Sequence, residues 1–291
     1  MPRIGTAPIN WNNEDLTLAV KVTGYPELLD RAREAGYEGI EWATSLPSHP
    51  GVLRPDLAAR GLELTGCWHA MDLTDSARHA GEAALAGERA QALARLGVRY
   101  LVCADRGSPE RLQLAGRVAP ADGLPPERWN ALVEGLRLVA HAVAPSGLRC
   151  VFHNHVGTWI ETEDETARLL EALPAAEVAW CLDTGHLAYA GGDVSALLGR
   201  FTDRVEYVHV KDVDGAVLEA SRREGLGFRA ALERFIFTTV GAGILDLAGV
   251  LGRLRDAGYA GWITVEQDTT RDDPTVTARR SREAIREVMG W

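Results

Sequence analysis

The sequence contains very little lysine, no long apolar run and no excess of basic residues. Lys21 and Lys211 are its two lysines, so 29 of the 31 basic residues are arginine, against 41 acidic residues and a net charge of −10. An acidic surface repels phosphate backbones, which argues against a nucleic-acid-binding protein. No segment reaches the roughly 20 apolar residues that cross a bilayer, and the amino terminus lacks the apolar stretch of a signal peptide. We therefore expect a cytoplasmic protein with no membrane or nucleic-acid partner.

Cysteine is also scarce, and a glycine fingerprint is missing. Cys67, Cys103, Cys150 and Cys181 are far apart, and each lies in or beside an apolar run. This placement predicts small, reduced core residues. After the first predicted strand, where a dinucleotide-binding fold carries Gly-x-Gly-x-x-Gly, the sequence reads Asn-Trp-Asn-Asn over residues 10–13. A doubly wound open sheet is therefore less favoured than a barrel.

The 291 residues, 46% of them hydrophobic, are punctuated by a recurring glycine joint. At each joint a helix-like stretch ends at glycine and an apolar, strand-like run begins at once. Glycine ends helices in the left-handed conformation, so each joint is typical of a helix C-cap that leads into a strand. The joints are at Gly36, Gly61, Gly97, Gly147 and Gly258.

With three further runs, the joints define eight predicted strands that alternate with amphipathic helices. The strands are expected at Arg3–Ile9, Tyr37–Trp42, Leu62–Trp68, Val98–Cys103, Leu148–Phe152, Glu177–Asp183, Val205–Lys211 and Trp262–Glu266. The helices are expected at Pro26–Ala35, Leu53–Arg60, Ser76–Leu96, Pro126–Ala144, Thr162–Leu173, Val194–Phe201, Leu247–Ala257 and Pro274–Met289. This alternation predicts an α/β protein with a single (β/α)8 TIM-barrel domain over residues 1–291.

Ionisable side chains gather where these strands end, which is where the active sites of such barrels lie. They are Glu41, His69, Asp105, His153, His155, Asp183, His186, His209, Lys211, Glu266 and Asp268. Asp105 and His69 are less certain members, since His69, like His49, is interpreted as a surface or capping residue. His153, Asp183, His209 and Glu266 come from four successive strands with apolar neighbours. Mixed imidazole and carboxylate groups in such a ring predict a catalytic divalent metal.

Several phrases resemble the xylose isomerase-like sugar isomerase and epimerase barrels. They are Asp183-Thr184-Gly185-His186, Val208-His209-Val210-Lys211-Asp212 and Val265-Glu266. Within that superfamily the chain most resembles the inosose (2-keto-myo-inositol) dehydratases, through residues 5–16, 153–158 and 235–243. The resemblance implies metal ligands at Asp183, His209 and Glu266. At the fifth strand the family usually has Glu in a Glu-Asn-His phrase, whereas this chain has His153-Asn154-His155.

The resemblance implies removal of a proton beside a carbonyl, with a divalent cation, Mn²⁺ or Co²⁺ before Zn²⁺, Fe²⁺ or Mg²⁺, stabilising the enediolate. His155 is the candidate base because two residues along an extended strand share a face, here that of the metal ligand His153. His186 is expected to protonate the leaving hydroxyl or to hold substrate. Lys211 would bind a substrate oxygen, or else pair with Asp212 or Glu41. Glu41 and Trp11 are expected to contact the polyol, with core packing as the alternative for Trp11.

These residues leave four hypotheses. The first is a lyase that removes water from a keto-inositol in inositol catabolism. The second is a keto-sugar isomerase or epimerase that returns the proton. The third is the DNA-repair endonuclease branch of the superfamily, which needs a basic groove that the −10 charge disfavours. The fourth is a catalytically silent polyol-binding barrel. Similar barrels also form dimers or tetramers, so a homo-oligomer is compatible with the resemblance.

Overall fold

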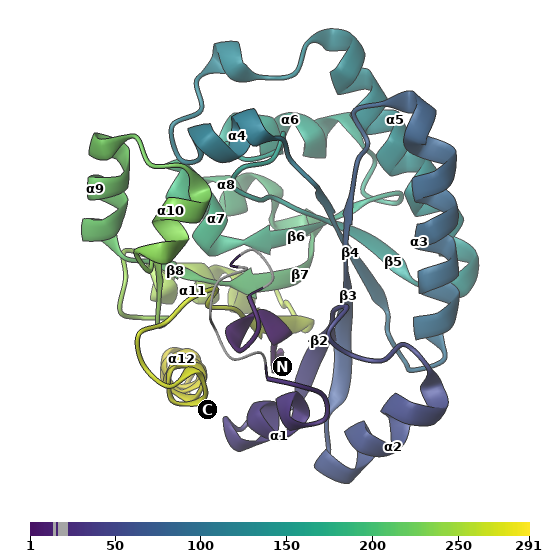
Figure 1. Ribbon diagram of the computed structural model, residues 1–291, viewed down its shortest axis with the longest axis vertical. Coiled ribbons are helices and arrows are strands. Elements are labelled where there is room, and N and C mark those ends of the chain that lie inside the picture. Colours follow the sequence, from purple (N-terminus) through teal and green to yellow (C-terminus); the bar gives the residue numbers. More distant parts are fainter. Residues whose placement is uncertain (14–15, 17–22) are drawn as a thin grey trace.

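The predicted strands form a closed parallel barrel in the computed structural model, which describes residues 1–13, 16 and 23–291. Within this described part, eight parallel strands close in the order β1-β10-β7-β6-β5-β4-β3-β2 (Figure 1). They are β1 (Arg3–Thr6), β2 (Gly39–Trp42), β3 (Glu63–Met71), β4 (Tyr100–Asp105), β5 (Arg149–His153), β6 (Ala179–Asp183), β7 (Val205–Val210) and β10 (Trp262–Val265). Each strand pairs with its neighbours along the chain, which confirms the predicted TIM barrel.

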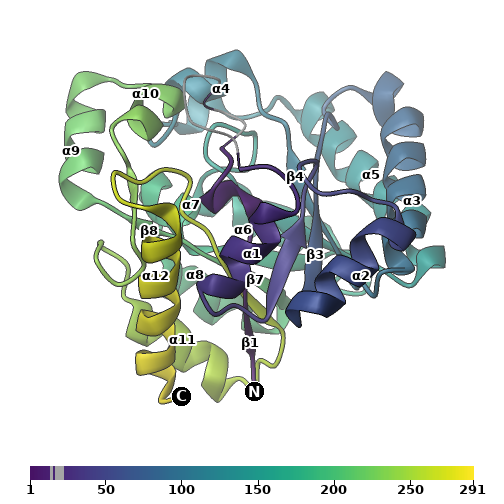
Figure 2. The same cartoon turned by 60° about the horizontal axis from the view of Figure 1, so that its bottom comes forward.

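Helices surround the barrel on the outside, as Figures 1 and 2 show. Those that match the predicted helices are α1 (Glu27–Glu34), α2 (Pro50–Arg60), α3 (His79–Ala94), α5 (Pro126–Val143), α6 (Glu163–Ala172), α8 (Val194–Phe201), α11 (Leu247–Asp256) and α12 (Pro274–Met289). Both chain ends lie at the end of the barrel where the strands begin (Figure 2).

The glycine joints take the conformation that the sequence predicts. Gly36, Gly61, Gly97, Gly147 and Gly258 have φ between 62° and 89°. An L-residue with a Cβ atom is strained in this region, whereas glycine enters it freely. The five helix-to-strand joints therefore follow from local backbone chemistry.

The first strand is shorter than predicted. β1 ends at Thr6, and Pro8–Asn10 form a 3₁₀ turn whose first two residues, Pro8 and Ile9, were expected to belong to the strand. Proline has no N–H to donate to a strand ladder and its ring fixes φ, which favours the start of a turn. Other strand ends moved by one to three residues; β3, for example, continues past Trp68 to Met71.

Short elements in the connections were not predicted. These are the helices α4 (Pro109–Leu114), α7 (Thr184–Ala190), α9 (Gly215–Glu224) and α10 (Phe228–Glu233), and the antiparallel strands β8 (Asp212–Val213) and β9 (Phe237–Thr238). Figure 2 shows α4, α9 and α10 at the end of the barrel away from the chain termini. The two-residue strands β8 and β9 are too short to show any periodicity in the sequence.

The barrel interior below the strand ends is closed by packed side chains. Tyr207 is fully buried, donates from its hydroxyl to Thr65 Oγ1 at 2.6 Å and accepts from Thr264 Oγ1 at 2.8 Å. The four cysteines are buried and free, which confirms their predicted state. The polar groups at the strand ends therefore lie on a closed layer of packed side chains, the floor of the site. None of the described helices is long and apolar enough to span a membrane.

Candidate metal centre and active site

The four predicted metal ligands meet at one point above this floor. His153, Asp183, His209 and Glu266 each offer one donor atom, and these atoms all lie within 4.8 Å of one another. His153 Nε2 is 3.1 Å from Asp183 Oδ2, and His209 Nδ1 is 3.3 Å from Glu266 Oε2. The gathering follows from topology, because β5, β6, β7 and β10 are consecutive in the barrel.

Asn154 places the first two of these ligands relative to each other. Its amide donates to the Asp183 carbonyl at 3.0 Å and accepts from the Asp183 N–H at 3.2 Å. It also accepts from Trp180 Nε1 at 3.1 Å. The amide thus continues the pairing of β5 with β6 past the end of β5 at His153. Because the side chain of Asn154 makes this pairing, the backbone after residue 154 can leave the strand. This accounts for the Asn at the centre of the His-Asn-His phrase.

Glu41 lies against His209, which the sequence did not predict. His209 Nε2 donates to Glu41 Oε2 at 3.0 Å, although β2 and β7 are separated by β1 and β10 in the barrel. Because Nε2 carries the proton of this bond, Nδ1 is the nitrogen turned toward Glu266 and Asp183. A carboxylate behind a ligand histidine is the usual way in which proteins orient a metal-binding imidazole.

Lys211 joins the carboxylates of the centre. Its ammonium is 2.6 Å from Glu266 Oε2, 3.2 Å from Asp268 Oδ1 and 3.6 Å from Asp183 Oδ2. The expected ion pair with Asp212 or Glu41 is therefore wrong. Asp212 instead accepts N–H groups from the loop over residues 241–245. Lys211 is turned away from it because side chains one residue apart point to opposite faces of a strand.

The electrostatics of the centre favour a cation. Burial acts to raise the pKa of Glu266, but His209 and Lys211 lower it well below its usual value. Burial acts to lower the pKa of His209, but Glu266 and Glu41 raise it to about 10. The imidazole of His209 thus takes up a proton because three carboxylates, those of Glu41, Asp183 and Glu266, lie 3.0 to 3.8 Å from its ring nitrogens. His153 Nδ1 is buried without a hydrogen-bond partner among the described residues. Two imidazoles and two carboxylates, with surplus negative charge around them, fit a divalent ion.

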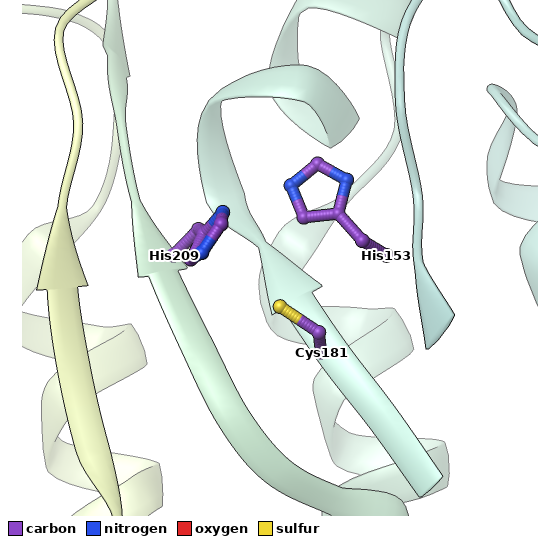
Figure 3. Close-up of side chains that lie close together, drawn as sticks. All are labelled: His153, Cys181 and His209. Atoms are coloured by element: carbon purple, nitrogen blue, oxygen red, sulfur yellow. The ribbon is translucent and has the colours of Figure 1, made fainter. Parts of the chain in front are cut away.

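The thiol of Cys181 lies directly beneath this centre. Figure 3 shows His153, Cys181 and His209 pointing toward one another from β5, β6 and β7. Their donor atoms also lie within 4.8 Å of one another. Burial and the nearby carboxylates of Glu41 and Asp183 raise the pKa of Cys181 well above its usual value. The sulfur is therefore a protonated thiol, and the carboxylate set is the better ligand group for a hard divalent ion.

His155 and His186 stack beside the centre. Their ring centroids are 3.7 Å apart. β5 ends at His153, so the expectation that His155 continues the extended strand is wrong. The ring nevertheless lines the cavity at this end of the barrel. His155 Nδ1 is 2.6 Å from the Val156 carbonyl, so it donates there and Nε2 holds the lone pair. Burial, with His153 and Lys211, lowers the pKa of His155 to about 3 and keeps the ring neutral.

His186 is fully buried and lies outside the cavity lining. Its Nε2 is 3.1 Å from Lys211 Nζ, and its backbone N–H donates to Asp183 Oδ1 at 2.7 Å. Because an ammonium can only donate, Nε2 accepts from Lys211. The ring therefore holds Lys211 in place, a role that the sequence did not suggest, and its position outside the lining supports neither of its two predicted roles, protonation of the leaving hydroxyl and binding of substrate.

Gly185 makes this packing possible. A Cβ atom at this position would lie 2.2 Å from Lys211 Cβ and 3.1 Å from its carbonyl carbon. The first turn of α7 can approach the end of β7 this closely only without a side chain. The glycine of the Asp-Thr-Gly-His phrase is thus explained by close approach.

A cavity of about 620 Å³ opens over these groups. Glu41, His153, His155, Lys211 and Glu266 all line it. Trp11 does not belong to the lining. Its ring packs in the core, 5% exposed, and its Nε1 donates to Thr275 Oγ1 at 3.1 Å. For Trp11 the position supports core packing, the alternative that the sequence left open.

Two histidines that the sequence grouped together have different environments. His49 caps α2, because its Nδ1 accepts from the Gly51 N–H at 3.1 Å. His69 was also expected at the surface or in a cap, and this is wrong. It is 1% exposed and lines the cavity near Arg89 and Asp105. His69 lies within β3, which runs to Met71, whereas the predicted strand ended at Trp68 and left His69 in a connection.

Comparison with known proteins places this site in a family. The family model described as xylose isomerase-like TIM barrel matches residues 29–288. The chain belongs to the xylose isomerase-like TIM barrel family. Among curated relatives, an inosose dehydratase of Geobacillus kaustophilus (strain HTA426) is 35% identical over 97% of this chain and 93% of its own. The rhizopine catabolism protein MocC of Rhizobium meliloti is 33% identical, covering 97% and 87%.

Among solved structures, the IOLI protein with a bound zinc atom superposes with a TM-score of 0.72. That superposition covers 99% of this chain and 98% of that one, at 15% sequence identity. At this identity the likeness concerns the fold. The family membership and the inosose dehydratase relatives confirm the resemblance drawn from the motifs.

Proposed function

We propose that this protein is a metal-dependent dehydratase that removes water from a keto-inositol such as 2-keto-myo-inositol, in inositol catabolism. One observation carries the proposal: four candidate ligand groups converge next to a cavity whose wall holds the neutral imidazole of His155 and the ammonium of Lys211. The similarity to an inosose dehydratase, at 35% identity over nearly the whole chain, supports a keto-inositol as the substrate.

The metal would be held by His153, Asp183, His209 and Glu266. When bound, a divalent ion supplies Lewis-acid stabilisation of the negative charge that develops on the substrate carbonyl oxygen. We propose Mn²⁺ or Co²⁺, with Zn²⁺, Fe²⁺ and Mg²⁺ to be compared in the same assay. The donor set of imidazoles and carboxylates supports any of these ions more than it supports a soft monovalent one.

His155 is proposed as the base that takes the proton beside the carbonyl. Its Nδ1–H is engaged with the Val156 carbonyl, which leaves the Nε2 lone pair for the substrate. Because the ring lines the cavity and is neutral, it can accept a proton without first losing one. The low pKa limits the basicity of His155 in the free protein, so we expect it to take a proton only from a C–H that is acidified by the neighbouring carbonyl.

Lys211 is proposed to bind the departing hydroxyl and give it a proton. Burial acts to lower its pKa, but Asp268, Glu266 and Asp183 raise it well above its usual value, so it is an ammonium. The C–O bond breaks as the electron pair left by the proton forms the C=C bond, and the hydroxyl leaves as water. His186 and Glu266 hold the ammonium at 3.1 and 2.6 Å while this happens.

The test is to reconstitute the protein with each divalent metal and supply 2-keto-myo-inositol in D₂O. We expect an ultraviolet-absorbing unsaturated diketone to form. A keto-sugar isomerase or epimerase would instead return deuterium to carbon and convert ketohexoses with no loss of water. That outcome with every metal would reject the lyase and establish the second function. The exposed His141 of α5 offers a matched control, since H141N leaves the cavity untouched.

A further inference from the structure

His69 stands on the side of the cavity opposite to the metal ligands. It lies in β3, next to β2 and β4, whereas the ligands come from β5, β6, β7 and β10. The side chain is 1% exposed to solvent and nevertheless forms part of the cavity lining. No role in the centre described above uses this imidazole.

The tautomer of His69 is fixed by Arg89 of α3. Arg89 Nη1 is 2.6 Å from His69 Nδ1. A guanidinium has donors only, so Nδ1 must accept and the single proton of the neutral ring lies on Nε2. Burial, together with Arg89 and Arg106, lowers the pKa of His69 to about 4, which keeps the ring neutral. Arg89 also lies over the ring of Trp42, 5.2 Å from its centroid, which limits its movement.

The Nε2–H group of His69 has no hydrogen-bond partner in the part of the chain that the structure describes. Buried donors in proteins are nearly always satisfied, so such a group at a cavity wall calls for an acceptor in the cavity. The hydroxyl of Ser45 also has no hydrogen-bond partner among the described residues. Ser45 follows the neighbouring strand β2 and lines the same cavity. Two residues with an unsatisfied buried polar atom, one in β3 and one in the connection after β2, thus line one cavity.

We propose that His69 is a substrate-binding residue whose Nε2–H donates to an oxygen of the substrate on the side remote from the metal ligands. Arg89 is the positioning residue that keeps the proton on Nε2. The identity of the substrate rests on the function proposed above, whereas the fixed tautomer and its unsatisfied donor do not.

The occupant that fits is a cyclic polyol. A six-membered ring with oxygen on every carbon presents oxygen atoms to both walls at once, so one edge can face the metal ligands while the other meets His69 and Ser45. The tautomer also excludes a metal-binding role for His69, because Nε2 carries the proton and the lone pair of Nδ1 is engaged by Arg89.

Nuclear magnetic resonance of ¹⁵N-histidine-labelled protein tests the tautomer directly, with Zn²⁺ as a diamagnetic metal. We expect His69, assigned by its loss in H69Q, to show a protonated Nε2 and an unprotonated Nδ1 at neutral pH. Addition of myo-inositol, which lacks the keto group and cannot be dehydrated, should shift the Nε2 resonance. R89M should allow the proton to exchange between the two nitrogens, and R89K should restore the wild-type tautomer.

Kinetics and calorimetry test the binding role. H69F keeps a ring and removes the donor, so we expect KM for 2-keto-myo-inositol and Kd for myo-inositol to rise at least about tenfold, with kcat changed less than about threefold. H69Q keeps an N–H near the same place and should recover most of the affinity. Metal content should be unchanged in both, and H141Q serves as the control at an exposed histidine.

The outcomes separate this inference from the proposed function. A protein that binds myo-inositol through His69 but does not dehydrate 2-keto-myo-inositol would retain the inference and reject the dehydratase. A His69 ring protonated on Nδ1, an Nε2 resonance that no polyol shifts, or equal Kd values for H69F and wild type would each overturn it, even with full dehydratase activity.

Discussion

Glu41 and His209 are hydrogen-bonded across the mouth of the barrel, 3.0 Å apart and 168 residues apart in the sequence. The bond turns His209 Nδ1 toward the other ligands. We predict that E41A weakens metal binding about 10- to 100-fold, the usual effect of losing the partner of a ligand histidine. E41Q, which keeps an oxygen acceptor, should lose less. Calorimetric titration with Mn²⁺ measures both, and E171A at an exposed glutamate is the control. Equal affinity in E41A and wild type would contradict the orientation argument.

Asp183 and Glu266 should be required for metal retention. D183N and E266Q each replace a charged ligand by a neutral amide, so we expect dialysed protein to keep little metal by elemental analysis. Asn at position 183 can still accept the His186 N–H that Asp183 Oδ1 holds at 2.7 Å, so the fold should persist. E171Q provides the matched control on the surface. Full occupancy in both variants would show that the ligand set is wrong.

Replacement of His155 should separate chemistry from metal binding. We expect H155N to bind metal as the wild type does while turnover falls by about 10² to 10⁴, the usual contribution of a positioned base. Steady-state rates and elemental analysis on the same preparation check this, alongside H141N. Turnover within a few fold of the wild type would exclude His155 as the base.

Stability should fall on acidification partly because of His69. Burial, with Arg89 and Arg106, lowers its pKa to about 4 in the folded chain, below the ordinary 6.5. Between these values the unfolded chain binds more protons, so the stabilisation is present above pH 6.5 and is lost as pH falls through 4. The shift corresponds to about 3 kcal/mol.

H69Q has no such titration. The free energy of unfolding of the wild type, minus that of H69Q, should therefore decrease by up to about 3 kcal/mol from pH 7 to pH 4. Urea unfolding at the two pH values measures this difference. A constant difference would show that His69 does not remain neutral in the folded protein, while H141Q should follow the wild type throughout.

Gly185 should not tolerate a methyl group. In G185A the new Cβ would meet Lys211 Cβ at 2.2 Å, so α7 and the end of β7 must separate. We expect a loss of about 1–3 kcal/mol in stability and displacement of Lys211, with at least tenfold lower turnover. G81A in α3 meets nothing within 4 Å and is the matched control, expected to be neutral or slightly stabilising. Wild-type turnover in G185A would mean that Lys211 need not be held at its present position.

The sequence by itself determined the barrel and the meeting of the four candidate metal ligands. Glycines such as Gly36 and Gly61 end helices through a local backbone preference, and apolar runs follow them at once, so strand order could be read along the chain. Because consecutive parallel strands are neighbours in a barrel, His153, Asp183, His209 and Glu266 had to meet. Both the ends of the helices and the order of the strands depend on residues that lie close together in the sequence.

Only the tertiary structure decided the partners of those groups. That Glu41 reaches His209, that Lys211 pairs with Glu266 in place of Asp212, and that Arg89 fixes the tautomer of His69 all depend on side-chain directions across the barrel. The same holds for Trp11, which packs in the core although it follows the first strand. Such contacts join residues far apart in sequence, and no local pattern records which rotamer each takes once the barrel has closed.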